Sequence, residues 1–285
     1  MKKNVYYLLA AITLILVSCS KSGDSRTQKS QEAEYTALKE QIIALNHNLP
    51  PKETTVTRAK WWKYALVAAA DAGGFFLAGG TGAPAITAGC TVSNLVWGFF
   101  KKEKEEDTPQ AETRALTQAK PSLLDSEVAL SYVDGAGLIH NKVIIDLYED
   151  YGESLFEYDD NTIITLVAQR VSLETNCTLA EASLELAERA TVINKAVTAY
   201  TSASTINEFI DNLELAAPER TALLEIVNVI LEGFDSIDAV EDNGNYCAAV
   251  HRLITESELE VNDKEILNST ASVANASARL WNVED

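Results

Sequence analysis

Histidines are the first residues to consider for chemistry, because few other side chains exchange a proton near neutral pH. The 285-residue chain has three, at positions 47, 140 and 251. His140 has the most informative surroundings, since Gly137-Leu-Ile-His140-Asn141 places an imidazole beside a carboxamide at the start of an apolar helical stripe. Such a pair either contacts a ligand or the glycine-rich segment, or satisfies hydrogen bonds at a helix end or in a core. We take His140 and Asn141 as a candidate ligand or structural polar site.

No enzyme motif accompanies these histidines. Catalytic triads and metal hydrolases need a histidine beside a nucleophile or carboxylates. The sequence has no His-Glu-x-x-His, no Gly-x-Ser-x-Gly and no Glu-x-x-His of a di-iron bundle. The glycines of 73–82 also lack the strand and lysine of a phosphate-binding loop. We therefore predict a protein that is not an enzyme, with no catalytic residue, no metal site and no cofactor.

Clustered carboxylates are the remaining candidates for acid–base or calcium chemistry. Two groups share helix faces, one at Glu181, Glu185 and Glu188, the other at Asp235, Asp238, Glu241 and Asp242. Their order does not match a calcium-binding helix–loop–helix, so solvated faces are the favoured interpretation.

Cys19 lies in a context unlike that of the other cysteines. Lys2 and Lys3 precede an apolar run over 5–17, and Leu16-Val17-Ser18-Cys19 resembles the lipobox of bacterial lipoproteins. The resemblance implies that 1–18 is a type II signal peptide and that Cys19 is acylated and becomes the new N-terminus. The acylated Cys19 would hold the protein on a membrane.

The residue after the lipobox cysteine, Ser20, resembles that of outer-membrane lipoproteins of Gram-negative bacteria. This implies a lipid-anchored location in the cell envelope, at the outer membrane, on its periplasmic or surface face. The Gly-x-x-His-Asn motif, together with Ala-Asp-Ala-Gly-Gly at 70–74, is loosely similar to uncharacterised envelope lipoproteins of Bacteroidota. That similarity carries no activity with it.

Three further cysteines remain. Cys90 lies in an apolar run, where a buried thiol is expected. Export makes a disulfide possible, and Cys177 with Cys247 is the one plausible pair.

Charge divides the chain unevenly. Residues 1–120 hold 15 Lys and Arg against 11 Asp and Glu, whereas 121–285 hold 8 against 31. So negative a block repels nucleic-acid phosphates and anionic lipid headgroups, and we exclude a nucleic-acid partner. The favoured interpretation is a solvated surface, and the alternative is a surface for basic partners or divalent cations.

The elements that would position these residues are helices, because apolar residues recur at helical spacing and alternating strand patterns are scarce. Helices are predicted over 28–49, 58–71 and 136–150, and then from an Asp159 cap. A capping box at Thr178 predicts a long helix through Tyr200, and Asn243-Gly244 predicts a break. The predicted fold is an all-α multi-helix bundle with a glycine-rich apolar helical hairpin.

The most unusual segment is 72–100, which has no charged residue and many glycines. Three interpretations stay open: a buried hairpin with close helix packing, a segment that inserts into or lies on a membrane, and a loose loop. Pro84 is expected to break the segment into two helices.

These patterns divide the chain into five parts. They are the signal peptide 1–18, a flexible tether 19–30, a helix plus glycine-rich apolar segment 31–100, a charged linker 101–121 and an acidic helical bundle 122–285. The first hypothesis is a lipid-anchored envelope protein that acts as a non-catalytic interaction or scaffold module with an unknown protein partner. The alternatives are a membrane-active, toxin-like or pore-like protein using 72–100, and an envelope enzyme using His140 with carboxylates.

Overall fold

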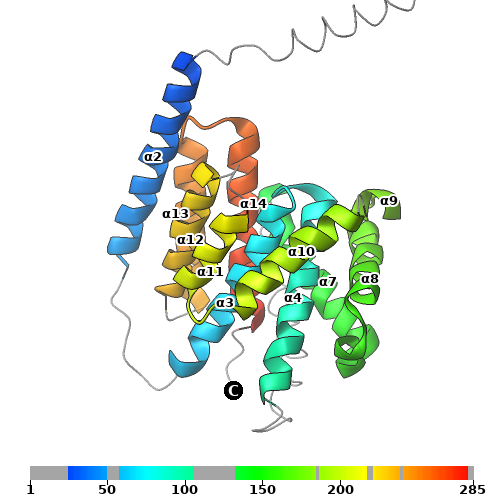
Figure 1. Ribbon diagram of the computed structural model, residues 1–285. Coiled ribbons are helices and arrows are strands. Elements are labelled where there is room, and N and C mark those ends of the chain that lie inside the picture. Colours follow the sequence, from blue (N-terminus) through cyan, green and yellow to red (C-terminus); the bar gives the residue numbers. More distant parts are fainter. Residues whose placement is uncertain are drawn as a thin grey trace, which may run out of the picture.

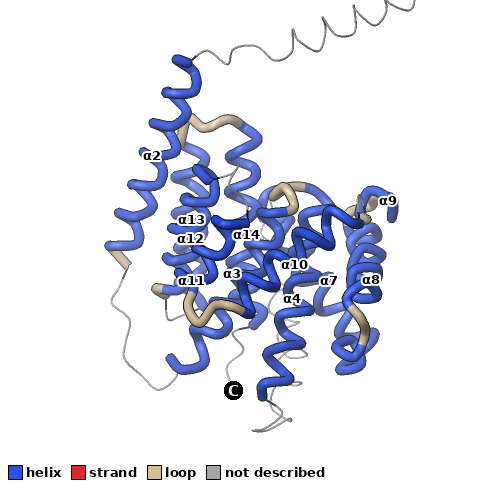
Figure 2. Tube along the Cα trace, viewed as in Figure 1, coloured by secondary structure: helices blue, strands red, loops and turns tan. Residues whose placement is uncertain are grey.

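The protein folds as an arrangement of helices. The computed structural model describes residues 25–49, 58–104, 132–183, 186–216, 221–237 and 240–281 (Figure 1). Within these ranges Figure 2 shows helices joined by short loops and no strand, which confirms the predicted all-α bundle. The helices are α2 (Ser25–His47), α3 (Arg58–Leu77), α4 (Gly82–Lys104), α7 (Tyr132–Tyr151), η1 (Gly152–Glu157), α8 (Asp160–Glu174), α9 (Leu179–Ala182), α10 (Leu186–Thr201), α11 (Ile206–Ala216), α12 (Thr221–Asp235), α13 (Val240–Glu256) and α14 (Val261–Trp281).

The hairpin of α3 and α4 lies in the middle of the molecule (Figure 1). Every residue of 65–76 and of 85–98 is buried. A helix that is apolar on all sides needs neighbours on all sides. Helix α3 accordingly packs on α4, α10, α11 and α14, and α4 packs on α7, α8 and α10. Of the three interpretations of 72–100, the structure shows the buried hairpin.

Glycines make the turn of this hairpin. The amide of Gly79 donates to the carbonyl of Phe76, and the amide of Gly80 donates to the carbonyl of Phe75, both at 3.0 Å. This pair of bonds closes a helix whose next residue is left-handed, and Gly79 has φ +114° and Gly80 φ +72°. Pro84 lies in the first turn of α4, so the glycines and not the proline separate the two helices.

Small residues let the two helices of the hairpin approach closely. A Cβ on Gly74 would lie 2.6 Å from Cγ2 of Val92, and one on Gly89 would lie 3.2 Å from the carbonyl oxygen of Asp71. The backbones of α3 and α4 are therefore nearly in contact at these glycines. Within the described ranges, no helix combines the length and apolar character that crossing a bilayer requires.

Two predicted helix caps are present. The carboxylate of Asp159 accepts from the amide of Thr162 at 3.1 Å and caps α8. Thr178 and Glu181 form the predicted capping box. The prediction that this box opens one long helix through Tyr200 is wrong. The short helix α9 ends at Ala182, and a second helix, α10, begins at Leu186.

The predicted break at Asn243-Gly244 is also wrong, since both residues lie inside α13. The chain turns earlier, after α12 ends at Asp235. Residues 1–24, which include Cys19, and most of the charged segment 101–121 lie outside the described residues.

Candidate functional site

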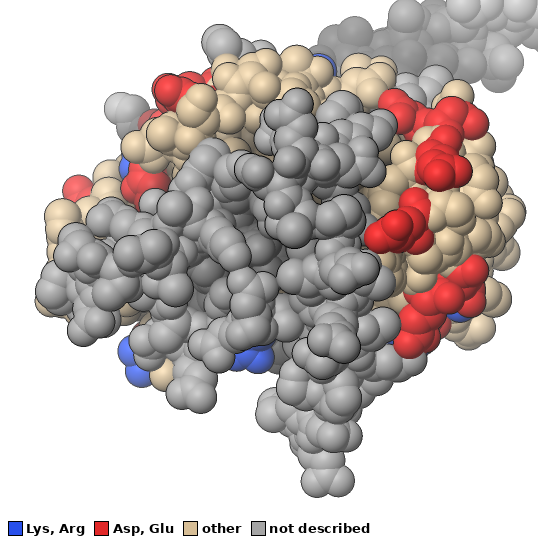
Figure 3. All heavy atoms as spheres, turned by 90° about the horizontal axis from the view of Figure 1, so that it is seen from below, with Lys and Arg blue, Asp and Glu red and all other residues tan. Residues whose placement is uncertain are grey.

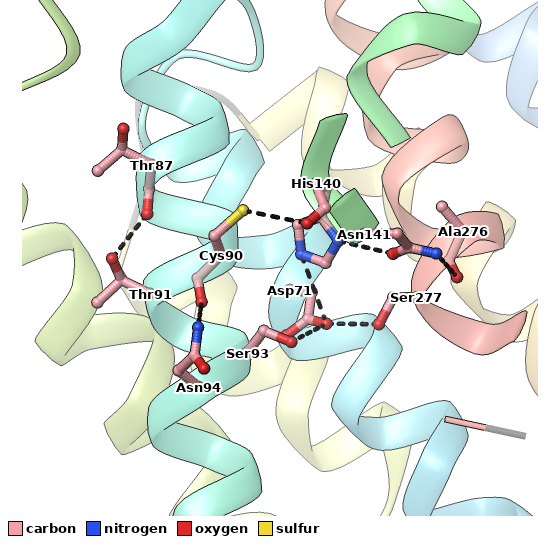
Figure 4. Close-up of polar contacts among 10 residues, drawn as sticks. All are labelled: Asp71, Thr87, Cys90, Thr91, Ser93, Asn94, His140, Asn141, Ala276 and Ser277. Atoms are coloured by element: carbon pink, nitrogen blue, oxygen red, sulfur yellow. Dashed lines mark hydrogen bonds and ion pairs between the residues drawn. The ribbon is translucent and has the colours of Figure 1, made fainter. Parts of the chain in front are cut away.

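Five polar side chains meet in the core where α3, α4, α7 and α14 pack together (Figure 4). We call this group the buried polar cluster, and its members are Asp71, Ser93, His140, Asn141 and Ser277. Four of them have no exposed surface, and Asn141 is 2% exposed. Polar groups buried this deeply need partners inside the protein, because an unmet hydrogen bond costs about 1–3 kcal/mol.

Asp71 is at the centre of the cluster. Its Oδ2 atom accepts a hydrogen bond from the hydroxyl of Ser93 on α4 at 2.8 Å and another from the hydroxyl of Ser277 on α14. The carboxylate of α3 thus links α3 to α4, the other helix of the hairpin, and to α14. Hydrogen bonds to a carboxylate are stronger than those between neutral groups, so they fix how the three helices sit on one another.

Asn141 fixes the orientation of His140. The amide of Asn141 donates from Nδ2 to the carbonyl oxygen of Ala276 at 2.7 Å, so its Oδ1 atom faces His140 as an acceptor. Nδ1 of the imidazole lies 3.0 Å from this oxygen and must be the donor. In the neutral ring Nε2 then carries a lone pair. It points toward Oδ2 of Asp71 at 3.8 Å, which is beyond hydrogen-bond distance.

The helix turn that carries His140 can approach α14 because of Gly137. A Cβ at this position would lie 2.5 Å from the carbonyl oxygen of Ser272 and 2.9 Å from Cβ of Ala276. The amide of Gly137 also donates to the hydroxyl of Ser272 at 3.3 Å. The Gly-x-x-His-Asn motif therefore has a packing explanation: the glycine brings α7 onto α14, and the asparagine one turn later bonds the α14 backbone.

Burial sets the protonation of the cluster. It lowers the pKa of His140 from 6.5 to about 4, against smaller opposing effects of the Asn141 side chain and the Gly89 backbone. The imidazole is thus neutral at pH 7. Burial, assisted by the nearby charge of Asp71, raises the pKa of the Cys90 thiol well above its ordinary value. Cys90 therefore stays a thiol, and it donates to the carbonyl oxygen of His140 at 3.6 Å.

The geometry does not assemble a nucleophile and its base. Both serine hydroxyls donate to Asp71, whereas a nucleophilic serine would donate to the imidazole. The cluster has no surface through which a substrate would reach His140. In the part of the chain that the structure describes, no group of three or more His, Cys, Asp or Glu side chains is placed to hold a metal ion. In this arrangement the cluster positions helices.

The structure brings the predicted pair His140 and Asn141 together with Asp71, Ser93 and Ser277, which were not predicted as site residues. Ser93 and Ser277 gave no signal, because serines occur on any helix face. Asp71 did offer a signal, since it is the one charged residue between Lys63 and Lys101. A lone charge in so long an apolar segment is expected to have a partner.

The other predicted sites lie apart from this cluster. Cys177, partly exposed beside α8, and Cys247, buried on α13, are free thiols, so the disulfide considered for them is not formed. Among the carboxylates, Glu181 is exposed and acts in the capping box. Side chains at 185, 188, 235, 238, 241 and 242 lie outside the described residues.

Exposed carboxylates are concentrated on α7, η1 and α8, and Figure 3 shows acidic side chains gathered on this side of the molecule. Two cations hold α7 and α8 together there. Lys142 lies 2.6 Å from Asp146 and 2.9 Å from Glu174, and Arg170 pairs with Asp146 and Asp150. These partly exposed pairs contribute little stability individually and mainly fix the register of the two helices.

The chain matches no protein-family model, no curated protein and no solved structure.

Proposed function

We propose that this protein is a lipid-anchored component of a bacterial cell envelope that acts as a non-catalytic interaction or scaffold module. The observation that supports this most directly is the sealing of the buried polar cluster. Its two serine hydroxyls donate to the carboxylate, its imidazole bonds the side chain of Asn141, and the imidazole, the carboxylate and both serines have no exposed surface. Residues with the right types for catalysis are thus used to hold four helices together.

The anchor rests on the sequence before the described residues. Acylation at Cys19 would fix the protein to a bilayer, and the polar composition of the residues that follow is typical of a linker. The first described helix, α2, packs on α12 and α13 at one side of the bundle (Figure 1). Anchoring through the N-terminus would leave the helical bundle free to present its surface to a protein partner.

Fractionation tests the anchor. We expect the wild-type protein in the membrane fraction and a Cys19→Ser variant in the soluble fraction. A Cys177→Ser variant is the matched control, since this partly exposed thiol lies on the folded bundle. Membrane association that survives Cys19→Ser would contradict the lipid anchor.

Active-site labelling tests the absence of catalysis. A fluorophosphonate probe, which reacts with activated serine hydroxyls, is expected to leave both Ser93 and Ser277 unmodified in the native protein. Labelling of either serine that disappears in a His140→Gln variant would reveal a nucleophile–base pair and overturn the non-catalytic proposal.

Photo-crosslinking in intact cells is expected to capture a protein partner.

A second candidate function is membrane activity through 72–100. One observation favours it: the segment 72–100, which has no charged residue, lies in a hairpin of α3 and α4 that other helices enclose, so its exposure would require these helices to separate. Membrane-active proteins need a way to keep an apolar hairpin away from water until it meets a bilayer.

A reversible lock tests this alternative. A Cβ on Gly98 would lie 3.9 Å from Cβ of Phe156, which suits a disulfide between α4 and η1. Membrane activity requires that the protein release dye from lipid vesicles, that the oxidised Gly98→Cys/Phe156→Cys variant fail, and that reduction restore release. Intact vesicles at high wild-type protein load would exclude the alternative.

A further inference from the structure

A groove runs between α13 and α14, away from the buried polar cluster. It encloses about 490 Å³, a volume within the range of small-molecule sites. The residues that matter for binding are His251, Arg252 and Thr255 on α13, with Asn275 and Arg279 on α14. Gly244 forms one end of the lining.

The charge of this groove is opposite to that of the protein. The whole chain carries a net charge of −19, yet the groove is lined by two arginines, Arg252 and Arg279, against one carboxylate, Glu256. Cations gathered in a concavity focus a positive potential, which attracts anions even to an acidic protein.

Arg279 is held in the groove with unused hydrogen-bonding capacity. Its Nε atom is buried and has no hydrogen-bond partner among the described residues. An unmet buried donor on the groove wall points to a ligand whose acceptor atoms would satisfy it.

Gly244 provides the space for this arginine. A Cβ at this position would lie 2.3 Å from Nη2 of Arg279. A glycine inside a helix is less stable than alanine by about 1 kcal/mol, and here its absence of a side chain lets the guanidinium lie against α13. This contact accounts for a glycine in the interior of α13.

We propose that the groove between α13 and α14 binds a small anion through a carboxylate or phosphate group, with Arg279 as the principal contact and Arg252 at the rim. The planar guanidinium offers two parallel N–H donors that match either oxyanion. The same chemistry is found in free metabolites and in phospholipid headgroups. The proposal is independent of whether the protein is a scaffold or membrane-active.

Thermal unfolding of the full-length protein tests the site. Millimolar inorganic phosphate is expected to raise Tm by about 2–4 °C relative to chloride at equal ionic strength. Arg279→Gln and Gly244→Ala are each expected to abolish the rise, the second because the new methyl displaces the guanidinium. Lys195→Gln is the control, because it removes one positive charge from an exposed position on α10.

The outcomes separate the two sources of the ligand. Co-sedimentation of the Cys19→Ser protein with vesicles containing phosphatidic acid, lost when Arg279→Gln is added, identifies a lipid headgroup. A phosphate-dependent rise in Tm without co-sedimentation identifies a free anion, and both results support the site. No rise beyond that in chloride, or a rise that persists in Arg279→Gln, overturns the proposal.

Discussion

The Oδ2 atom of Asp71 lies 3.8 Å from Nε2 of His140, with both side chains completely buried. The two atoms do not share a hydrogen bond, because Asn141 holds the imidazole proton on Nδ1 and both facing atoms are acceptors. Protonation of Nε2 would introduce a donor between them. A fall in pH that protonates His140 would therefore change the interaction between the imidazole on α7 and the carboxylate on α3.

This relationship predicts a dependence of stability on pH. The pKa of His140 is about 4 in the folded protein and near 6.5 when unfolded, so the unfolded chain binds the proton first as pH falls. The contribution is fully present above pH 6.5 and is lost between pH 6.5 and 4, amounting to about 2 kcal/mol by pH 5. Urea unfolding at successive pH values measures it.

Other groups also titrate between pH 6.5 and 4, so the test compares the pH dependence of the free energy of unfolding between wild type and variants. A His140→Gln variant is expected to lose less stability than wild type between pH 7 and 5, by about 2 kcal/mol. His47→Gln is the control, because this histidine is exposed on α2. Identical pH profiles for wild type and His140→Gln would show that His140 titrates normally.

Substitution of alanine for each of two glycines in α7 is expected to change the stability of the protein in opposite directions. Gly137→Ala is expected to destabilise the protein by about 1–3 kcal/mol, because its Cβ would lie 2.5 Å from the Ser272 carbonyl oxygen. Gly135→Ala is expected to stabilise it by up to about 1 kcal/mol, since no atom lies within 4 Å of that Cβ. Denaturant midpoints measure both, and equal effects would contradict the close contact of α7 with α14.

Asn141→Leu removes the hydrogen bonds of the cluster while keeping a side chain of similar shape. It leaves Nδ1–H of His140 and the carbonyl of Ala276 without their partner, which is expected to cost about 2–4 kcal/mol. Asn48→Leu is the control, because its bond to the carbonyl of Ala44 is exposed. A cost below about 1 kcal/mol for Asn141→Leu would show that these bonds are not required.

Thiol reactivity checks the state of the cysteines. In the Cys19→Ser variant we expect rapid reaction of Cys177 with a disulfide reagent, slower reaction of Cys247, and no reaction of Cys90 before unfolding. The reason is that Cys90 is completely buried with a raised pKa, whereas Cys177 is partly exposed. A native protein without a fast thiol that gains two thiols on reduction would indicate a disulfide between Cys177 and Cys247.

Local signals predicted much of the fold. Asp159 and the Thr178–Glu181 capping box were found from sequence because a cap depends on residues within one helical turn. The break after Ala182 was not found, because the following Ser-Leu-Glu does not forbid a helix. Gly244 was predicted to break a helix because nothing near it in the sequence explains a glycine there. The explanation is the guanidinium of Arg279, which lies against Gly244 and belongs to another helix.

In the buried polar cluster, too, residues close in sequence were predicted and residues brought together by the fold were not. His140 and Asn141 are adjacent in sequence, so they were identified together. Their partners Asp71, Ser93 and Ser277 are distant in sequence and meet through the packing of three other helices. The sequence left open whether the apolar segment beside Asp71 is buried, and only the fold shows which residues its carboxylate contacts.

Mass spectrometry of the N-terminal peptide, using protein from the membrane fraction of its native host, tests the lipid-anchored account most directly. The prediction is a chain that starts at position 19 with acyl groups on its cysteine. A chain that starts at Met1, or one whose Cys19 carries a free thiol, would contradict it.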